Sequence, residues 1–331
     1  MEPPAEERVA ASGRPDDGGG AAGPVRLVAV DLDGVVWLGG TILPDAVEAL
    51  TTVVERGFDL RYVTNNSTAH REAVSERLAA AGLPAGADRV FTSGYVTALW
   101  LRQRLPEGAQ VLVVGEAGLL RELTEAGLAP VRAGGEPAAP GSGAGAAPAA
   151  PATAFAPAAA PVAAAPASVA APSAAAPFQA VVVGMDRDFT FTGLAQAQAA
   201  ILTGALFVGT NPDATFPTPN GLLPGAGSVV AAVATAAQKE PVFMGKPGLG
   251  LAEVLAAVTG VAAAQTLFVG DRMSTDIGMG RRAGMITALV LTGVTSPADL
   301  ERARAEGSAY LPDHVLATLA DLPALLEALT A

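Results

Sequence analysis

The sequence predicts an α/β protein whose core is a mainly parallel β-sheet, and three observations lead to this fold class. Apolar runs of strand length recur along the chain. These runs are continuous rather than alternating, which is typical of parallel strands covered on both faces. Stretches with helical spacing of apolar residues separate the runs, and such alternation favours parallel pairing with ligands bound beyond the carboxyl ends of the strands.

The expected elements follow one another in a regular order. Strands are expected over residues 25–30, 60–63, 111–114, 180–183, 206–208, 266–269 and 286–291. Helices are expected over residues 44–57, 71–81, 96–105, 193–203, 228–238, 249–258 and 276–283. The first helix illustrates how these helix bounds are predicted. Pro44 and Asp45 suit the first turn of a helix, and Gly57 suits its end.

Composition excludes several classes of protein. The chain has no cysteine, which excludes disulfides, thiolate metal sites and cysteine nucleophiles. Its two histidines, His70 and His314, lack the paired spacing of a zinc hydrolase, so we expect ordinary surface or core imidazoles. The formal net charge is −12 without any run of Lys or Arg, so we expect no nucleic-acid partner.

We expect neither a secretion signal nor a membrane span. Glu2, Glu6 and Glu7 occupy the region where a signal peptide needs a basic start. The most apolar long segment, residues 152–176, is interrupted repeatedly by proline, which defeats a regular spanning helix. These features predict a cytoplasmic protein.

Two segments are expected to lack a packed structure. Residues 1–24 are rich in Pro, Gly and acidic side chains, and they predict a disordered tail. Residues 133–177 are almost all Ala, Pro, Gly and Ser, which predicts a flexible loop spliced into a domain. A docking tail is the alternative interpretation of this insertion. If the loop is flexible, deletion of residues 135–176 should spare activity.

Two carboxylates follow the first expected strand. Asp31 is the first residue beyond that strand, and Asp33 comes after it across the tight turn that Gly34 permits. Crowded carboxylates repel one another, and Mg²⁺, which prefers oxygen ligands, relieves the repulsion. Taken alone, the pair also fits an Asx turn with solvated acids.

Polar residues follow two further strands. Thr64, Asn65 and Asn66 offer hydroxyl and amide donors suited to phosphate oxygens, although alone they also fit a helix cap or turn. Asp271 lies at the end of the strand over residues 266–269, so it can supply a third carboxylate for the same cation. Asp276 is expected to cap the following helix and to orient its neighbours.

Lysine is rare in this chain, which draws attention to Lys246. Of the twenty basic residues only Lys239 and Lys246 are lysine. The Gly-Lys-Pro context is not a P-loop, because neither Ser nor Thr follows the lysine. Taken alone it fits a surface lysine. Similarly, Gly225-Ala226-Gly227 lacks the spacing of a dinucleotide-binding loop and is interpreted as a turn before a helix.

Together these segments resemble the motifs of the haloacid dehalogenase-like (HAD) hydrolases, in order and in strand-end position. More narrowly, the chain is similar to subclass IIA, which includes p-nitrophenyl phosphatase, phosphoglycolate phosphatase, glycerol 3-phosphate phosphatase and NagD. The resemblance covers residues 25–331 except the Ala/Pro-rich insertion. It implies a Rossmannoid parallel-sheet core of residues 25–105 and 241–331. An α/β cap of residues 106–240, interrupted by residues 133–177, would be inserted into that core.

The resemblance also implies a function, namely Mg²⁺-dependent hydrolysis of small phosphomonoesters through an aspartyl-phosphate. Asp31 would be the nucleophile, and Asp33 the general acid and then the general base. Lys246 would neutralise charge, and Thr64, Asn65 and Asn66 would hold the phosphoryl oxygens. Asp31, the Asp33 carbonyl and Asp271 would hold Mg²⁺, with Asp276 in support.

Other interpretations and partners remain open at this point. A phosphomutase of the same superfamily and a non-catalytic phospho-ligand-binding regulator are the alternatives, whereas Asp33 argues against a dehalogenase. The expected partner is a small phosphorylated metabolite, and the cap is expected to close over the site and to select the leaving group. Relatives suggest a homodimer formed through the cap. Glycerol 3-phosphate, phosphoglycolate and nucleotides all remain candidate substrates.

Overall fold

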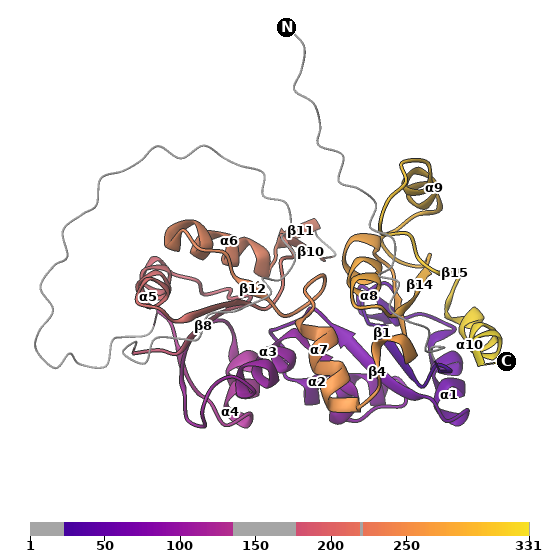
Figure 1. Cartoon of the computed structure of the whole chain (residues 1–331), viewed down its shortest axis with the longest axis horizontal. Helices are drawn as coiled ribbons and strands as arrows, with labels where there is room; N and C mark the ends of the chain where they lie inside the picture. The colour runs from indigo at the N-terminus through magenta and orange to yellow at the C-terminus, as the bar shows by residue number, and fades with distance from the viewer. Residues whose placement is uncertain (1–22, 135–176, 219–220, 331) are drawn as a thin grey trace, which may run out of the picture.

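The computed structural model describes residues 23–134, 177–218 and 221–330. Nearly all of the expected tail and of the expected insertion lies outside these residues. Within them the chain forms two parallel β-sheets with helices on their faces (Figure 1). No helix of the described part is long and apolar enough to cross a membrane.

The first sheet has six strands in the order β15-β14-β13-β1-β4-β5, all parallel. Its strands are β1 (Leu27–Asp31), β4 (Asp59–Thr64), β5 (Val90–Thr92), β13 (Thr266–Gly270), β14 (Ile286–Val290) and β15 (His314–Leu316). A small hairpin of β2 (Trp37–Leu38) and β3 (Thr41–Ile42) follows β1. The helices of this part of the chain are α1 (Ala46–Glu55), α2 (Arg71–Ala80), α3 (Ser93–Arg102), α7 (Gly250–Thr259), α8 (Gly278–Arg282), α9 (Pro297–Ala305) and α10 (Leu322–Thr330).

The second sheet has five parallel strands in the order β12-β9-β8-β6-β7. They are β6 (Gln110–Val114), β7 (Ala129–Arg132), β8 (Ala180–Val183), β9 (Leu206–Gly209) and β12 (Val242–Phe243). Its helices are α4 (Ala117–Glu125), α5 (Phe191–Leu202) and α6 (Ala226–Ala237). An antiparallel hairpin of β10 (Thr215–Thr218) and β11 (Gly221–Pro224) precedes α6.

Apolar clusters hold these layers together. The strands of the first sheet alternate in the direction of their side chains, so Val28 and Val30 face α1, α2 and α10. Leu27 and Ala29 point to the other face, into a cluster that also contains side chains of α3, α4 and α7 and of the second sheet. The far face of the second sheet packs against α5 and α6, which lie together on that side in Figure 1. The two sheets therefore share one apolar cluster.

Candidate active site

The order of the first sheet gathers the carboxyl ends of three strands at one edge. Strand β1 lies between β13 and β4, with Val30 opposite Val269 and Asp31 opposite Val63. Asp31 therefore ends the central strand, Thr64 ends its neighbour on one side, and Asp271 follows its neighbour on the other. The structure therefore brings these three residues to the same edge of the sheet.

Lys246 lies among the carboxylates of this edge. Its Nζ atom is 2.6 Å from Asp31 Oδ1 and 2.8 Å from Asp276 Oδ1, and all three side chains are buried. Burial alone would lower the pKa of Lys246, but the Asp276 and Asp31 carboxylates raise it above its ordinary value. Lys246 is therefore a protonated, buried cation held on two carboxylates, not a surface lysine.

The Asp271 carboxylate packs against the backbone of two glycines, Gly34 and Gly293. A Cβ atom at Gly34 would lie 2.4 Å from Asp271 Oδ2, and one at Gly293 would lie 2.0 Å from it, so only glycine leaves room for this carboxylate. The Val294 N–H donates to Asp271 Oδ2 at 2.6 Å. Burial, and then the Asp276 carboxylate, raise the pKa of Asp271 to about 6 against the effect of this hydrogen bond.

The donor set at this edge fits a hard divalent cation. Oxygen atoms of Asp31, Asp271 and Asp276 lie within 4.8 Å of one another, and all three residues are buried. Burial raises the pKa of Asp31 well above its ordinary value although Lys246 opposes the rise, because Asp276 and Asp271 add repulsion. One lysine cannot balance three buried carboxylates, so a cation such as Mg²⁺ would neutralise the surplus charge.

Asp276 differs in position from what the sequence predicted. It lies inside a π-helical turn, Met273–Ile277, and does not cap α8. Its Oδ2 accepts a hydrogen bond from the Arg272 N–H at 3.0 Å, while its Oδ1 meets Lys246. The prediction that Asp276 caps the helix was wrong, because the chain already turns at Met273, before α8 begins. The Asp276 carboxylate is therefore inside the buried cluster and not at the helix end.

Asp33 stands apart from the buried cluster. Its side chain is exposed, and its Oδ1 accepts a hydrogen bond from the Trp37 indole N–H at 2.8 Å. It lines a pocket of about 140 Å³ together with Trp37, Thr64, Asn66 and Arg77, among others. A larger pocket, of about 360 Å³, lies at the opposite edge of the first sheet, beside the first residues of β1 and β4.

The three polar residues at the carboxyl end of β4, Thr64, Asn65 and Asn66, differ in what they contact. Thr64 is buried, and its Oγ1 accepts from the Asn66 N–H at 3.1 Å. Asn66 is exposed, and its Oδ1 accepts from the Thr68 N–H at 2.8 Å, which shapes the loop into an Asx-type turn. The Asn65 side chain is turned away from both, toward the backbone of Lys246. Only Asn65 is thus fully committed to contacts within the protein.

Some residues of this region were not singled out by sequence reasoning. Asn211 and Asp213, from the loop after β9, contact Asn65. Gly293 and Val294, from the loop after β14, contact Asp271. All four residues lie beyond the carboxyl end of a strand, and this position could have identified them from the sequence. The loop after β14, however, contains no carboxylate or lysine that would draw attention to it.

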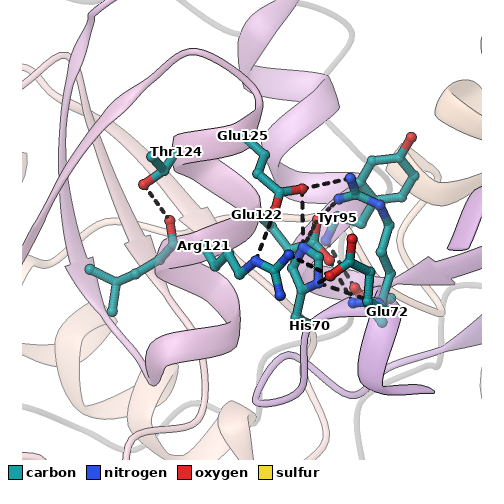
Figure 2. A network of polar contacts seen from close by, with 10 residues as sticks. His70, Glu72, Tyr95, Arg121, Glu122, Thr124 and Glu125 are labelled. Carbon is teal, nitrogen blue, oxygen red and sulfur yellow. Dashed lines mark hydrogen bonds and ion pairs between the residues drawn. The ribbon is translucent and has the colours of Figure 1, made fainter. Parts of the chain in front are cut away.

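A second polar cluster joins α4 to the start of α2 (Figure 2). The His70 ring caps α2 by accepting from the Glu72 N–H at 3.3 Å, while its Nε2 lies 3.2 Å from Glu125 Oε2. His70, Glu122 and Glu125 are close enough together to hold a metal ion. However, Arg71 already forms ion pairs with both glutamates, so the cluster carries its own cation.

The Arg71 contact is largely buried. The Arg71 N–H donates to Glu122 Oε1 at 2.8 Å, and the Glu122 side chain is fully buried. Burial raises the pKa of Glu122 above its ordinary value, against the hydrogen bond and charge of Arg71. A Cβ atom at Gly118 would lie 2.2 Å from the Thr68 carbonyl oxygen, so α4 approaches the loop after β4 at backbone contact.

Comparison with known proteins gives consistent matches. Residues 28–129 match the family model of haloacid dehalogenase-like hydrolases, and residues 243–322 match a HAD-hydrolase-like family model. Glycerol-3-phosphate phosphatase of Gallus gallus is 38% identical over 308 residues, which cover 90% of this chain and 90% of that protein.

Solved structures agree with these sequence matches. The p-nitrophenyl phosphatase from Archaeoglobus fulgidus superimposes with a TM-score of 0.73 at 29% identity, covering 91% of this chain and 99% of the other. The glycerol phosphate phosphatase Rv1692 from Mycobacterium tuberculosis, in complex with magnesium, gives a TM-score of 0.71 at 31% identity, covering 92% of this chain and 79% of the other.

Proposed function

The chain belongs to the haloacid dehalogenase-like hydrolases, subclass IIA, and we propose that the cluster of Asp31, Lys246 and Asp271 is its catalytic centre. The protein is a phosphoric monoester hydrolase that acts on small phosphate esters and uses Mg²⁺. The single observation that carries the site assignment is the buried contact of Lys246 Nζ with Asp31 Oδ1 at 2.6 Å, beside a surplus of carboxylates.

Asp31 is the nucleophile in this proposal. Its carboxylate oxygen attacks phosphorus, the bond from phosphorus to the ester oxygen breaks, and the ester oxygen takes a proton from the Asp33 carboxyl. Water then attacks the aspartyl-phosphate, gives its proton to the Asp33 carboxylate, and releases inorganic phosphate and free Asp31. The separate location of Asp33 supports this division, because its exposed carboxyl can exchange protons while Asp31 is held by Lys246.

Lys246 stabilises the negative charge that moves between the nucleophile and the transferred group. Thr64 and Asn66 are proposed to hold the phosphoryl oxygens, since both line the pocket beside Asp33. Asp31, the Asp33 carbonyl and Asp271 would hold Mg²⁺, with Asp276 close enough to join them. When bound, Mg²⁺ supplies positive charge that offsets the repulsion between the incoming phosphate and these carboxylates.

The core and cap assignment belongs to the same proposal. Residues 25–105 and 241–331 would form the catalytic core and residues 106–240 the cap, with residues 133–177 as an insertion in it. A small phosphorylated metabolite is the proposed partner, and the glycerol phosphate phosphatases among the relatives support a three-carbon ester as the first choice to test. A cytoplasmic location stays a prediction from the sequence.

A homodimer formed through the cap is proposed as well. Phe191 and Leu202, at the two ends of α5, are 84% and 58% exposed, which gives this cap helix apolar contact surface. Sedimentation of the full chain tests the assembly. A monomer at micromolar concentration would remove this part of the proposal without affecting the catalytic assignment.

The decisive experiment measures phosphate release from a panel of small phosphomonoesters, with Mg²⁺ and with EDTA, for the wild type and Asp31→Asn in parallel. We expect release that requires Mg²⁺ and that is abolished in the variant. Unchanged release by Asp31→Asn would remove Asp31 from the mechanism. Transfer of phosphate within a sugar phosphate, or tight ligand binding without release, would instead favour a mutase or a regulator.

A further inference from the structure

The side-chain amide of Asn65 uses both of its donor hydrogens inside the protein. Its Nδ2 donates to the Lys246 carbonyl oxygen at 2.8 Å and to Asp213 Oδ2 at 2.9 Å. Its Oδ1 accepts from the Lys246 N–H at 2.8 Å. A primary amide has two N–H donors, so this side chain has none left for a phosphoryl oxygen.

These contacts bind the backbone of Lys246 at both its N–H and its C=O group. The N–H and the C=O of Lys246 are both bonded to the same amide group, which fixes the direction in which the Lys246 side chain leaves the chain. From there Nζ reaches Asp31 and Asp276. The preceding glycine makes the approach possible, because a Cβ atom at Gly245 would lie 2.6 Å from Asn65 Oδ1.

The cap reaches the same amide group through the loop after β9. Asn211 Nδ2 donates to the backbone carbonyl oxygen of Asn65 at 2.7 Å, and Asp213 Oδ2 accepts from the Asn65 side-chain amide. This loop is itself fixed by the start of α6, where a Cβ atom at Gly225 would lie 2.3 Å from the Asp213 carbonyl oxygen. Contacts therefore run without interruption from α6 through Asp213 and Asn65 to Lys246.

We propose that Asn65 is a positioning residue that fixes Lys246 for phosphoryl transfer, and that Asp213 of the cap acts on the reaction through Asn65. This inference rests on the proposed catalytic role of Lys246, and it replaces the sequence-based expectation that the Asn65 side chain holds phosphate. Loss of the Asn65 amide should displace Nζ from Asp31, so it should lower kcat more than it changes KM. A displacement of about 1 Å can cost about 100-fold in rate.

The first test is a double-mutant cycle between Asn65 and Lys246. We expect Asn65→Ala to lower kcat by about 10- to 100-fold on an aryl phosphate, measured with Mg²⁺ on variants whose melting curves show that they are folded. In a Lys246→Ala background, followed with enzyme in excess over long times, the same change should alter the rate by less than about twofold. An equal loss in both backgrounds would mean that Asn65 contacts the substrate directly, and would overturn the inference.

The second test uses Asp213. It does not depend on the first, so it can be made even if Asn65→Ala does not fold or Lys246→Ala has no measurable rate. Asp213→Ala should lower kcat by about 2- to 10-fold with little change in KM, since one hydrogen bond to Asn65 is lost. Asp213→Asn keeps an acceptor oxygen and should restore most of the rate. The matched control is Asp188→Ala, because Asp188 belongs to the same part of the chain but its side chain is 82% exposed.

The outcomes separate the inference from the proposed function. Wild-type turnover in Asp213→Ala, or a loss of similar size in Asp188→Ala, would overturn the inference and leave the phosphatase assignment intact. Absence of Mg²⁺-dependent phosphate release in the wild type would overturn the proposed function itself. In the Asn65→Ala background, Asp213→Ala should have no further effect, and an additive loss would also contradict the proposed order of contacts.

Discussion

At the scale of single residues, Asp33 differs most from the other carboxylates of the site. It is exposed and bonded to the Trp37 indole, whereas Asp31, Asp271 and Asp276 are buried around Lys246. We expect Asp33→Asn to lower turnover by about 10²- to 10⁴-fold, because an amide cannot deliver or accept the proton of the reaction. Steady-state phosphate release on an alkyl phosphate measures the loss.

The matched control for this prediction is Asp88→Asn, an exposed carboxylate on the same part of the chain whose side chain is 80% exposed. It should turn over at the wild-type rate. Turnover of Asp33→Asn within a few-fold of the wild type would exclude Asp33 as the general acid. An aryl phosphate with a good leaving group should be less sensitive to the variant, since it needs less protonation on departure.

The pKa of Asp271 gives a second prediction, which concerns stability. The folded protein raises this pKa from an ordinary 3.8 to about 6. Between these values the folded state binds more protons than the unfolded state, so the metal-free protein loses stability as pH rises through this window. Mg²⁺ and protons compete for the same oxygens, so Mg²⁺ should raise Tm more at about pH 7.5 than at about pH 5.

Melting curves with Mg²⁺ and with EDTA at the two pH values test this prediction. Asp271→Asn is the matched variant, because its amide cannot ionise, and its Mg²⁺-induced shift in Tm should be small at both pH values. A shift in wild-type Tm that is equal at both pH values would contradict the role of Asp271 in cation binding.

Three polar residues of this site were accessible from the sequence because each lies at the carboxyl end of a strand. Asp31, Asp271 and Thr64 meet wherever parallel strands pair as neighbours, which the alternation of strands and helices already predicts. The contacts of Asn65 with Lys246 and Asp213 were not accessible. They join segments separated by 181 and 148 positions, and no local pattern specifies which side-chain atoms meet.

At the scale of elements, the contact between α2 and α4 is expected to contribute measurably to the free energy of unfolding. We expect Arg71→Ala to destabilise the protein by about 3–5 kcal/mol, since it leaves the buried Glu122 carboxylate without its main cation. The control is Arg304→Ala, an exposed pair with Glu301, which should cost about 0–1 kcal/mol. Urea unfolding of both variants measures the difference, and equal costs would contradict the importance of burial.

Sequence patterns located the long apolar strands well and short or weak elements less well. The expected strand over residues 180–183 coincides with β8, and the helix expected over residues 71–81 ends one residue beyond α2. The hairpins β2–β3 and β10–β11 were missed because their strands have only two to four residues and little apolar content to bury. Helix α4 was also missed, although Leu119 and Leu123 provided a helical spacing.

At the scale of the whole molecule, the two sheets are not independent. They share an apolar cluster around α3 and α7, and Gly118 and Asn211, which belong to the proposed cap, already contact the loop that follows β4. Closure of the whole cap, as expected from the sequence, would have to break these contacts. The hairpin β10–β11 presents apolar surface of its own, because Leu222 and Leu223 on it are 70% and 50% exposed.

The topology of the second sheet also refines the deletion predicted for residues 135–176. Val131 of β7 and Val181 of β8 pair with opposite sides of Leu112, and all three strands are parallel. A parallel connection must return along the sheet, which takes about a dozen residues. We expect replacement of residues 135–176 by about twelve Gly and Ser residues to retain phosphate release, and direct joining of residues 134 and 177 to impair folding. Loss of folding with the long replacement would show that the segment has a structural role.

The pairing of β1 with β13 also sets an order of events while the chain is being made. Val30 can pair with Val269 only after residues 31–268 have been synthesised, so β1 is among the first strands made but gains its second neighbour late. Until then one edge of this apolar strand is open to other chains. Newly made protein is therefore most exposed to misassociation before its final segments emerge, and truncation ahead of β13 should yield aggregates rather than a smaller folded enzyme.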